Sequence, residues 1–178
     1  GQLSPKLAAV VALGRDATLR LSYGEGFRAP TLLDLYSRSV APGASAGAPV
    51  VTEPAPNLAA ERVKSLELGV DARLPTRARV AMSLFAQRLS DLIYRQRVNP
   101  VLNVVANAGE AKVDGIEVEV SQPLFGDSVR LHGTATHLFR YDITRNDAVP
   151  ASVGKRLTDV PQALYTASIE GRWEAWSG

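Results

Sequence analysis

The chain has 178 residues, of which 46% are apolar and 21% charged, and its formal net charge is +2. This balance is typical of a folded domain, and without a dense Lys/Arg cluster it gives no sign of a nucleic-acid partner. The absence of cysteine excludes a disulfide framework and a thiolate metal site. No apolar run approaches the roughly 18 residues that a membrane-spanning helix needs.

Period-two alternation of apolar and polar residues predicts about seven strands. In chain order they cover residues 6–13, 17–23, 66–73, 79–87, 116–121, 129–136 and 162–172. Each strand places small aliphatic residues on one face and polar or charged residues on the other. Near the strand ends stand the aromatic residues Tyr23, Tyr94, Trp173 and Trp176. A lipid-facing band flanked by aromatic girdles has this pattern.

The connections between these strands alternate in length. Short turns are expected at residues 14–16, 74–76 and 124–127, and long connections at 24–61, 98–110 and 142–159. This favours an all-β, antiparallel up-and-down transmembrane β-barrel, whose long loops all lie on one side of the membrane. The same alternation fits a soluble β-sheet module that binds a partner through its loops, and that alternative stays open.

Pairs of carboxylates can perform acid–base chemistry, and the polar strand face carries Asp71, Glu117, Glu119 and Glu170. Because they are interleaved with arginines such as Arg130 and Arg172, we expect charge ladders on a hydrated wall rather than the paired carboxyls of a hydrolase. His132 and His137 are five residues apart, which places them on opposite faces of a strand and argues against a shared metal. We therefore expect no enzyme and no cofactor.

Five stretches, in this order, carry a resemblance to a known family. They are YGEGFRAPTLLDLY from Tyr23, PNLAAERVKSLELGV from Pro56, FAQRLSDLI from Phe85, NAGEAKVDGIEVEV from Asn107 and GKRLTDVPQALY from Gly154. Together they resemble the barrel of TonB-dependent outer-membrane receptors over nearly the whole chain. The residues at motif positions are Phe27, Arg28, Pro30, Leu35, Tyr36, Asn57, Glu61, Glu67, Gly69, Asn107, Gly109, Gly115 and Glu117. Ala59 and Ala60 depart from the family's usual Lys-Pro.

The resemblance implies part of the C-terminal half of a plugged barrel of about 22 strands. Residues 1–178 would all belong to the barrel domain, with the plug domain, the TonB box and the final strands outside this piece. It also implies a Gram-negative outer-membrane location, with membrane lipid, a scarce nutrient and TonB as partners and no nucleic acid. Ferric siderophores are the commonest cargo of such receptors, and corrinoids such as vitamin B12 come second.

For the motif residues the resemblance implies mainly structural roles at the rim of the barrel. Arg28 should pair with a carboxylate on a neighbouring strand or plug, and Glu61 and Glu67 should accept arginines from adjacent strands. Gly24 and Gly26 should let the backbone turn at the rim. Phe27 should anchor at the interface, and Pro30 should end the ladder. An apolar patch at the loop base should be formed by Leu32, Leu33, Leu35 and Tyr36.

Two surfaces are candidates for contact with cargo. The loops over residues 37–56, 99–107 and 142–153 are the predicted cargo-facing surface, because binding residues are often carried by loops on a rigid scaffold. Inside the lumen, we expect a polar set made of Glu119, Arg130, His132, Glu170 and Arg172.

Overall fold

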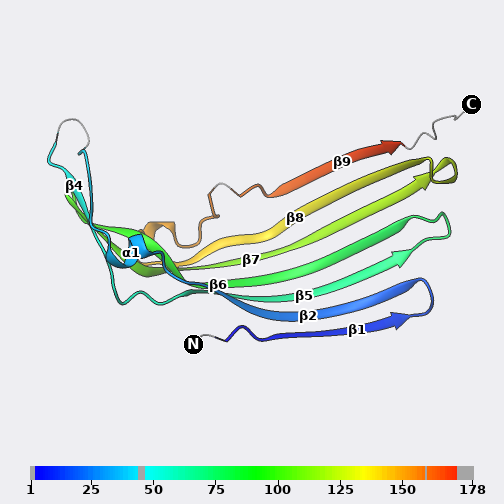
Figure 1. Ribbon diagram of the computed structural model, residues 1–178, viewed down its shortest axis with the longest axis horizontal. Coiled ribbons are helices and arrows are strands. Elements are labelled where there is room, and N and C mark those ends of the chain that lie inside the picture. Colours follow the sequence, from blue (N-terminus) through cyan, green and yellow to red (C-terminus); the bar gives the residue numbers. More distant parts are fainter. Residues whose placement is uncertain (1–2, 44–46, 159, 172–178) are drawn as a thin grey trace, which may run out of the picture.

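The computed structural model describes residues 3–43, 47–158 and 160–171. Seven long strands follow one another in chain order as a single antiparallel sheet (Figure 1). They are β1 (Lys6–Leu13), β2 (Ala17–Arg28), β5 (Glu61–Arg73), β6 (Arg79–Asn99), β7 (Leu102–Leu124), β8 (Val129–Asn146) and β9 (Ala163–Gly171). The predicted all-β, up-and-down order is confirmed.

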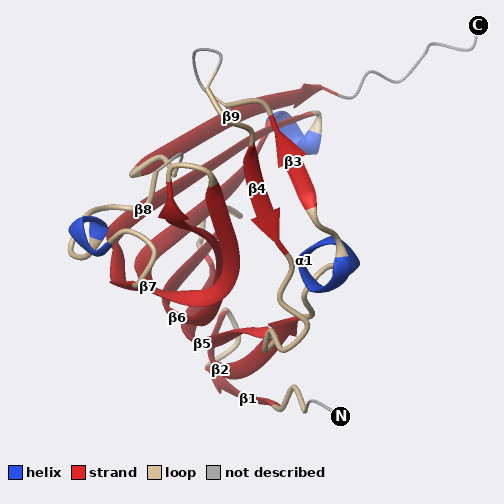
Figure 2. Cartoon of the chain, turned by 90° about the vertical axis from the view of Figure 1, so that its left-hand side faces the viewer, coloured by secondary structure: helices blue, strands red, loops and turns tan. Residues whose placement is uncertain are grey.

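The two faces of the sheet differ in chemistry, as the alternation predicts. Leu21, Leu68, Leu84 and Ile116 stand in direct register across four strands and therefore share one face. Apolar side chains on this face are exposed along most of the strand length. The sheet is curved (Figure 2), and its hollows are lined by the polar face, which is therefore concave. The apolar face is convex, and no described segment forms a second layer over it.

The described helices are short: α1 spans Leu32–Tyr36, and the 3₁₀ turns η2 and η3 span Phe125–Asp127 and Pro150–Ser152. None of them is long and apolar enough to cross a membrane.

The short turns gather at one end of the sheet and the long connections at the other (Figure 1). We call these the short-turn end and the long-connection end. Gly14 and Gly126 occupy short turns with φ of 77° and 70°, a left-handed conformation that glycine adopts without steric strain. The predicted separation of short and long connections by side is therefore confirmed for the first and third long connections.

The first long connection carries structure of its own. Thr31 caps α1 by accepting a hydrogen bond from the Asp34 N–H at 3.2 Å. Two short strands follow, β3 (Ser39–Ala41) and β4 (Val50–Glu53), which pair with each other. β4 then pairs in parallel with the first residues of β7, so it extends the sheet beyond the end of β8 (Figure 2).

The predicted long connection over residues 98–110 is wrong. β6 runs to Asn99 and β7 begins at Leu102, so only Pro100 and Val101 separate two strands that project as one long hairpin. The pairing is interrupted by register shifts between Leu89 and Ile93, which break the period-two pattern. Without that pattern the sequence does not show that the strands continue.

Two strands run further than the sequence predicts, and two glycines differ in their role. β2 continues to Arg28 and β8 to Asn146, so the connections that begin there are shorter than expected. Gly24 and Gly26 do not turn the backbone at the rim. They lie inside β2, paired with Ser65 and Val63, because a glycine with ordinary strand geometry fits the ladder like any other residue.

Candidate functional site

Three motif residues from distant parts of the sequence meet at the long-connection end, and we call Arg28, Glu61 and Asn107 the rim clasp. The Glu61 carboxylate is buried and accepts hydrogen bonds from the Arg28 Nε and, at 2.9 Å, from the Ile93 N–H. One carboxylate thus joins the end of β2, the start of β5 and the middle of β6. A charge-assisted bond to a buried acceptor is among the stronger polar contacts in a protein.

Asn107 completes the clasp from β7. Its Oδ1 accepts from the Ala59 N–H at 2.8 Å, and its Nδ2 donates to the carbonyls of Ala59 at 3.0 Å and Asp91 at 2.7 Å. Asp91 lies in the irregular part of β6 with φ of 57°. Asn107 therefore holds the chain entering β5 against the irregular segment of β6.

Arg145 on β8 extends the network to a further strand. It donates through Nη1 to Glu110 at 2.8 Å and through Nη2 to the Asn107 carbonyl at 3.2 Å, and its Nε lies 3.3 Å from Asp147. The sequence analysis missed Arg145, Asp91 and Ile93. Their roles depend on which residues face each other after the register shifts, and no sequence pattern reports that.

Two motif glycines leave room for aromatic rings. A Cβ on Gly115 would lie 2.7 Å from the Phe85 ring and 2.8 Å from the His137 carbonyl oxygen, and a Cβ on Gly109 would collide with the Tyr94 ring. Each ring belongs to β6 and lies across the glycine of β7. These glycines are required by close packing and not by turns.

Gly69 makes room for an arginine that lies between two carboxylates of β5. Arg20 stands opposite Gly69 in the register, and its guanidinium passes over the glycine, 3.1 Å from where a Cβ would be. This lets Arg20 reach Glu67 at 3.2 Å and Asp71 at 3.6 Å, while the Ser83 hydroxyl donates to Glu67 at 2.6 Å. The carboxylates on either side of the glycine are therefore bridged by one cation.

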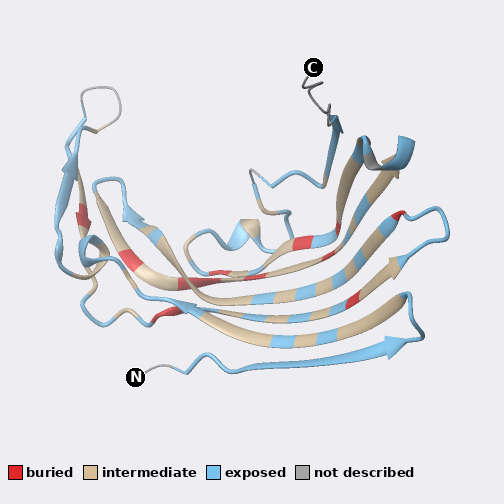
Figure 3. Ribbon diagram, turned by 45° about the vertical axis from the view of Figure 1, so that its right-hand side comes forward, coloured by how far each residue is buried: buried red, intermediate tan, exposed pale blue. Residues whose placement is uncertain are grey.

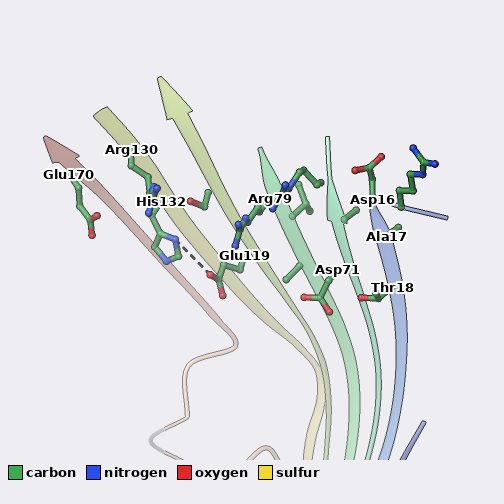
Figure 4. Close-up of a pocket in the computed structure, with 15 residues that line it drawn as sticks. Asp16, Ala17, Thr18, Asp71, Arg79, Glu119, Arg130, His132 and Glu170 are labelled. Atoms are coloured by element: carbon green, nitrogen blue, oxygen red, sulfur yellow. Dashed lines mark ion pairs between the residues drawn. The ribbon is translucent and has the colours of Figure 1, made fainter. Parts of the chain in front are cut away.

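A polar hollow lies on the concave face near the short-turn end (Figure 4). Four of the predicted lumen-facing residues line it: Glu119, Arg130, His132 and Glu170. His132 Nδ1 lies 3.8 Å from the Glu119 Oε1, and Arg79 reaches into the same space from β6. The fifth residue, Arg172, and the aromatic residues Trp173 and Trp176 lie outside the described residues. Glu117 lines a neighbouring hollow with Thr134 and Thr136.

The remaining motif residues lie around the first long connection. Phe27 is exposed and is the next-to-last residue of β2, and Pro30 follows the end of that strand. Asn57 is exposed in the turn before β5. The expected apolar patch is wrong, because Leu32 and Leu33 of α1 are 76% and 71% exposed. What holds α1 near the base of the connection is a backbone bond, from the Ala55 N–H to the Asp34 carbonyl at 2.9 Å. Leu35 and Tyr36 complete that helix.

The chemistry of these sites is that of binding and positioning. The carboxylates of the clasp and of the ladder face arginines, which holds them as ion-pair partners. In the described part of the chain no three His, Cys, Asp or Glu side chains gather in a way that would hold a metal ion. The inner face of the curved sheet therefore offers charged and hydrogen-bonding groups.

Comparison with known proteins agrees with this reading. A sequence model of the family "TonB dependent receptor-like, beta-barrel" matches residues 1–178, and no curated protein sequence matches.

Three solved structures share the fold at low sequence identity. A variant of the ferric enterobactin receptor PfeA of Pseudomonas aeruginosa has a TM-score of 0.76 at 18% identity and covers 95% of this chain and 25% of its own. The siderophore receptor PirA of Acinetobacter baumannii has a TM-score of 0.70 at 17% identity and covers 93% of this chain and 26% of its own. The FrpB iron transporter of Neisseria meningitidis has a TM-score of 0.65 at 18% identity and covers 97% of this chain and 25% of its own. The chain thus spans about a quarter of the length of the structures that it matches.

Proposed function

The chain belongs to the TonB-dependent receptor-like β-barrel family, and from that premise we propose that it forms part of the wall of an outer-membrane receptor that imports a scarce nutrient. The family is one of receptors and not of enzymes. The observation that carries the proposal is the family match over residues 1–178. The exposed apolar convex face supports a lipid-facing wall and disfavours a soluble β-sheet module, because soluble monomers rarely expose a contiguous apolar surface of this extent.

A ferric siderophore is the proposed cargo, with a corrinoid as the alternative. The support is that the PfeA and PirA proteins, which share this fold, are named as receptors for ferric enterobactin and for siderophores. Energy would come from TonB through a part of the protein beyond this chain.

The proposed cargo-facing surface is built from residues 37–56, 99–107 and 142–153. These segments converge at the long-connection end. β4 pairs with residues Leu102–Val104 of β7, and the Arg145 Nη2 donates to the Asn107 carbonyl at 3.2 Å. The β6–β7 hairpin lends the first segment a rigid support, since the Val51 N–H donates to the Val101 carbonyl at 2.8 Å. A loop stiffened in this way binds with a smaller entropy loss than a free loop.

The test is uptake by cells that carry the full-length protein. Replacing residues 37–56 with a Gly/Ser linker of equal length should reduce uptake of ferric enterobactin at least tenfold, while the protein still assembles in the outer membrane. A Gly-Ser insertion in the turn at residues 14–16, at the opposite end, is the matched control and should leave uptake unchanged. Uptake that persists without TonB, or that the linker leaves intact, would contradict the proposal. Uptake of a corrinoid in place of the siderophore would select the alternative cargo.

A further inference from the structure

A second cavity on the concave face lies at the short-turn end, beside the polar hollow, and we call it the arginine cavity. Its volume is about 360 Å³, and the residues that line it are Arg73, Arg77, Arg79, Ser121, Pro123 and Arg130. None of these described residues is an acid, whereas the polar hollow is also lined by Asp71, Glu119 and Glu170. Positive charge is therefore concentrated in the arginine cavity.

Two of these arginines face each other directly. Arg73 ends β5 and Arg79 begins β6, and the two residues are paired in the register. Side chains in such positions have Cβ atoms about 5 Å apart, and like charges at that spacing destabilise the pair. Ser121 of β7 stands opposite Arg79, and Arg130 of β8 lies beyond it on the same side of the sheet (Figure 4). An anion in the cavity would replace this repulsion by attraction.

The neighbouring acids do not neutralise the pair. In the part of the chain that the structure describes, the side chains of Arg73, Arg79 and Arg130 form no hydrogen bond or ion pair. Asp71, the nearest acid on the concave side of β5, is already paired with an arginine of β2 at 3.6 Å. Glu170 stands opposite Arg130 in the register but lines the polar hollow and not the arginine cavity.

The turn between β5 and β6 holds the backbone of both paired arginines in place. The Leu74 N–H donates to the Ala78 carbonyl at 2.8 Å, and Ala78 is buried. Gln122 of β7 fastens this turn from the side, because its Nε2 donates to the Thr76 carbonyl at 3.0 Å. A cavity whose backbone is fixed in this way loses less entropy when a ligand binds.

We propose that Arg73, Arg79 and Arg130 bind a small polyanion with several negatively charged oxygens, such as a polycarboxylate or a polyphosphate. A guanidinium is always charged, and its planar fork matches two oxygens of one acidic group. The volume lies within the roughly 300–1,000 Å³ of pockets that take small molecules. Because short turns of a transmembrane barrel lie on the periplasmic side, the site would lie at the periplasmic mouth of the lumen. This placement rests on the proposed function, under which an anionic ferric chelate would meet these arginines as it leaves.

The experiment measures pyrophosphate binding to the full-length protein in a neutral detergent by isothermal titration calorimetry, with the thermal unfolding midpoint as a second readout. Pyrophosphate should raise the midpoint of the wild-type protein. Arg73→Gln and Arg79→Gln should each weaken the affinity at least tenfold, and Arg79→Lys, which keeps the charge but not the fork, should weaken it less. Without pyrophosphate, both Gln variants should be at least as stable as the wild type, because each removes one charge of a repelled pair.

Arg88→Gln is the matched control. It removes the same charge from the same strand as Arg79, but on the convex face, and should leave the affinity unchanged. Unchanged affinity in Arg79→Gln, an equal loss in Arg88→Gln, or no binding by the wild type would each overturn the proposal. A loss of stability in Arg73→Gln without pyrophosphate would also overturn it, because a carboxylate from outside this chain would then already fill the cavity. Uptake of ferric enterobactin after replacement of residues 37–56, at the opposite end, reports separately on the proposed function.

Discussion

The rim and the wall of this sheet are held together in different ways. At the long-connection end, buried residues cluster along the ends of β5, β7 and β8, and polar side chains bond to backbone groups of other segments (Figure 3). Along the wall, the backbone ladder is the main connection between strands, and the side chains on both faces keep much of their surface in solvent. Charged pairs of the wall, such as Arg20 with Glu67, keep about two fifths of their side-chain surface in solvent.

This difference determines which substitutions matter. A buried polar group that loses its partner is left without water to replace it, whereas an exposed ion pair is replaced by solvent at little loss. We therefore expect large effects at the rim and small ones on the wall, and the following substitutions test that order.

Glu61→Ala should have the largest effect. It leaves the Ile93 N–H and the Arg28 guanidinium without their common acceptor, and breaking a buried charged contact of this kind should lower the free energy of unfolding by about 3 kcal/mol. Urea unfolding of the full-length protein in detergent micelles measures it. Glu53→Ala is the control, because its ion pair with Arg38 is exposed, and it should change stability by less than about 0.5 kcal/mol. Equal losses in both variants would remove the distinction between buried and exposed charged contacts.

Gly115→Ala should be the exception on the wall, with a rim-sized effect. The added Cβ would press on the Phe85 ring and on the His137 carbonyl, and such overpacking should lower stability by about 2 kcal/mol. Gly133→Ala is the matched control on β8, where the nearest atom would be the Thr166 carbonyl oxygen at an ordinary 3.6 Å. The same unfolding measurement compares them. A Gly115→Ala protein as stable as Gly133→Ala would mean that Phe85 moves aside freely.

The structure of the wall could be predicted from the sequence, because apolar and polar residues alternate there with a period of two. Leu66, Leu68 and Val70 face one side and Glu67 and Asp71 the other, and a period of two allows no other arrangement in a strand. The strand type, the order of the strands and the side of the short turns all follow from that repeat. The family motifs then predicted that Arg28 would meet a carboxylate, and the structure pairs it with Glu61.

The contacts at the rim could not be predicted from the sequence, because they depend on irregular backbone. Asp91 and its neighbours shift the β6–β7 register, so the alternation fails where the hairpin continues. Asn107 bonds to backbone atoms of residues 48 and 16 positions away in the sequence. Every residue has a backbone carbonyl, so residue types do not show which carbonyl will accept the bond. Gly24 and Gly26 are a different case, because glycine often marks a turn, whereas here both are ordinary members of the ladder.

Asn107→Ala should have an intermediate effect. It removes three hydrogen bonds, but Ala59 is exposed and water can replace part of what is lost, so we expect about 1.5 kcal/mol. Limited proteolysis should also cut residues 54–60 faster, because Asn107 holds that segment. Asn57→Ala, in the exposed turn nearby, is the control and should alter neither readout. Unchanged cleavage in Asn107→Ala would show that the Glu61 contacts alone hold the entry to β5.

Arg20→Gln should have the smallest effect, about 0.5 kcal/mol, because its contacts with Glu67 and Asp71 are solvent-exposed ion pairs. Salt gives the sharpest comparison with the rim. At about 1 M salt the screening length falls to roughly 3 Å, so the difference between Arg20→Gln and wild type should vanish. The loss in Asn107→Ala involves neutral hydrogen bonds and should persist in the same salt. A loss in Arg20→Gln above about 2 kcal/mol, or one that salt leaves unchanged, would show that Arg20 and the carboxylates around Gly69 are shielded from water, as Glu61 is.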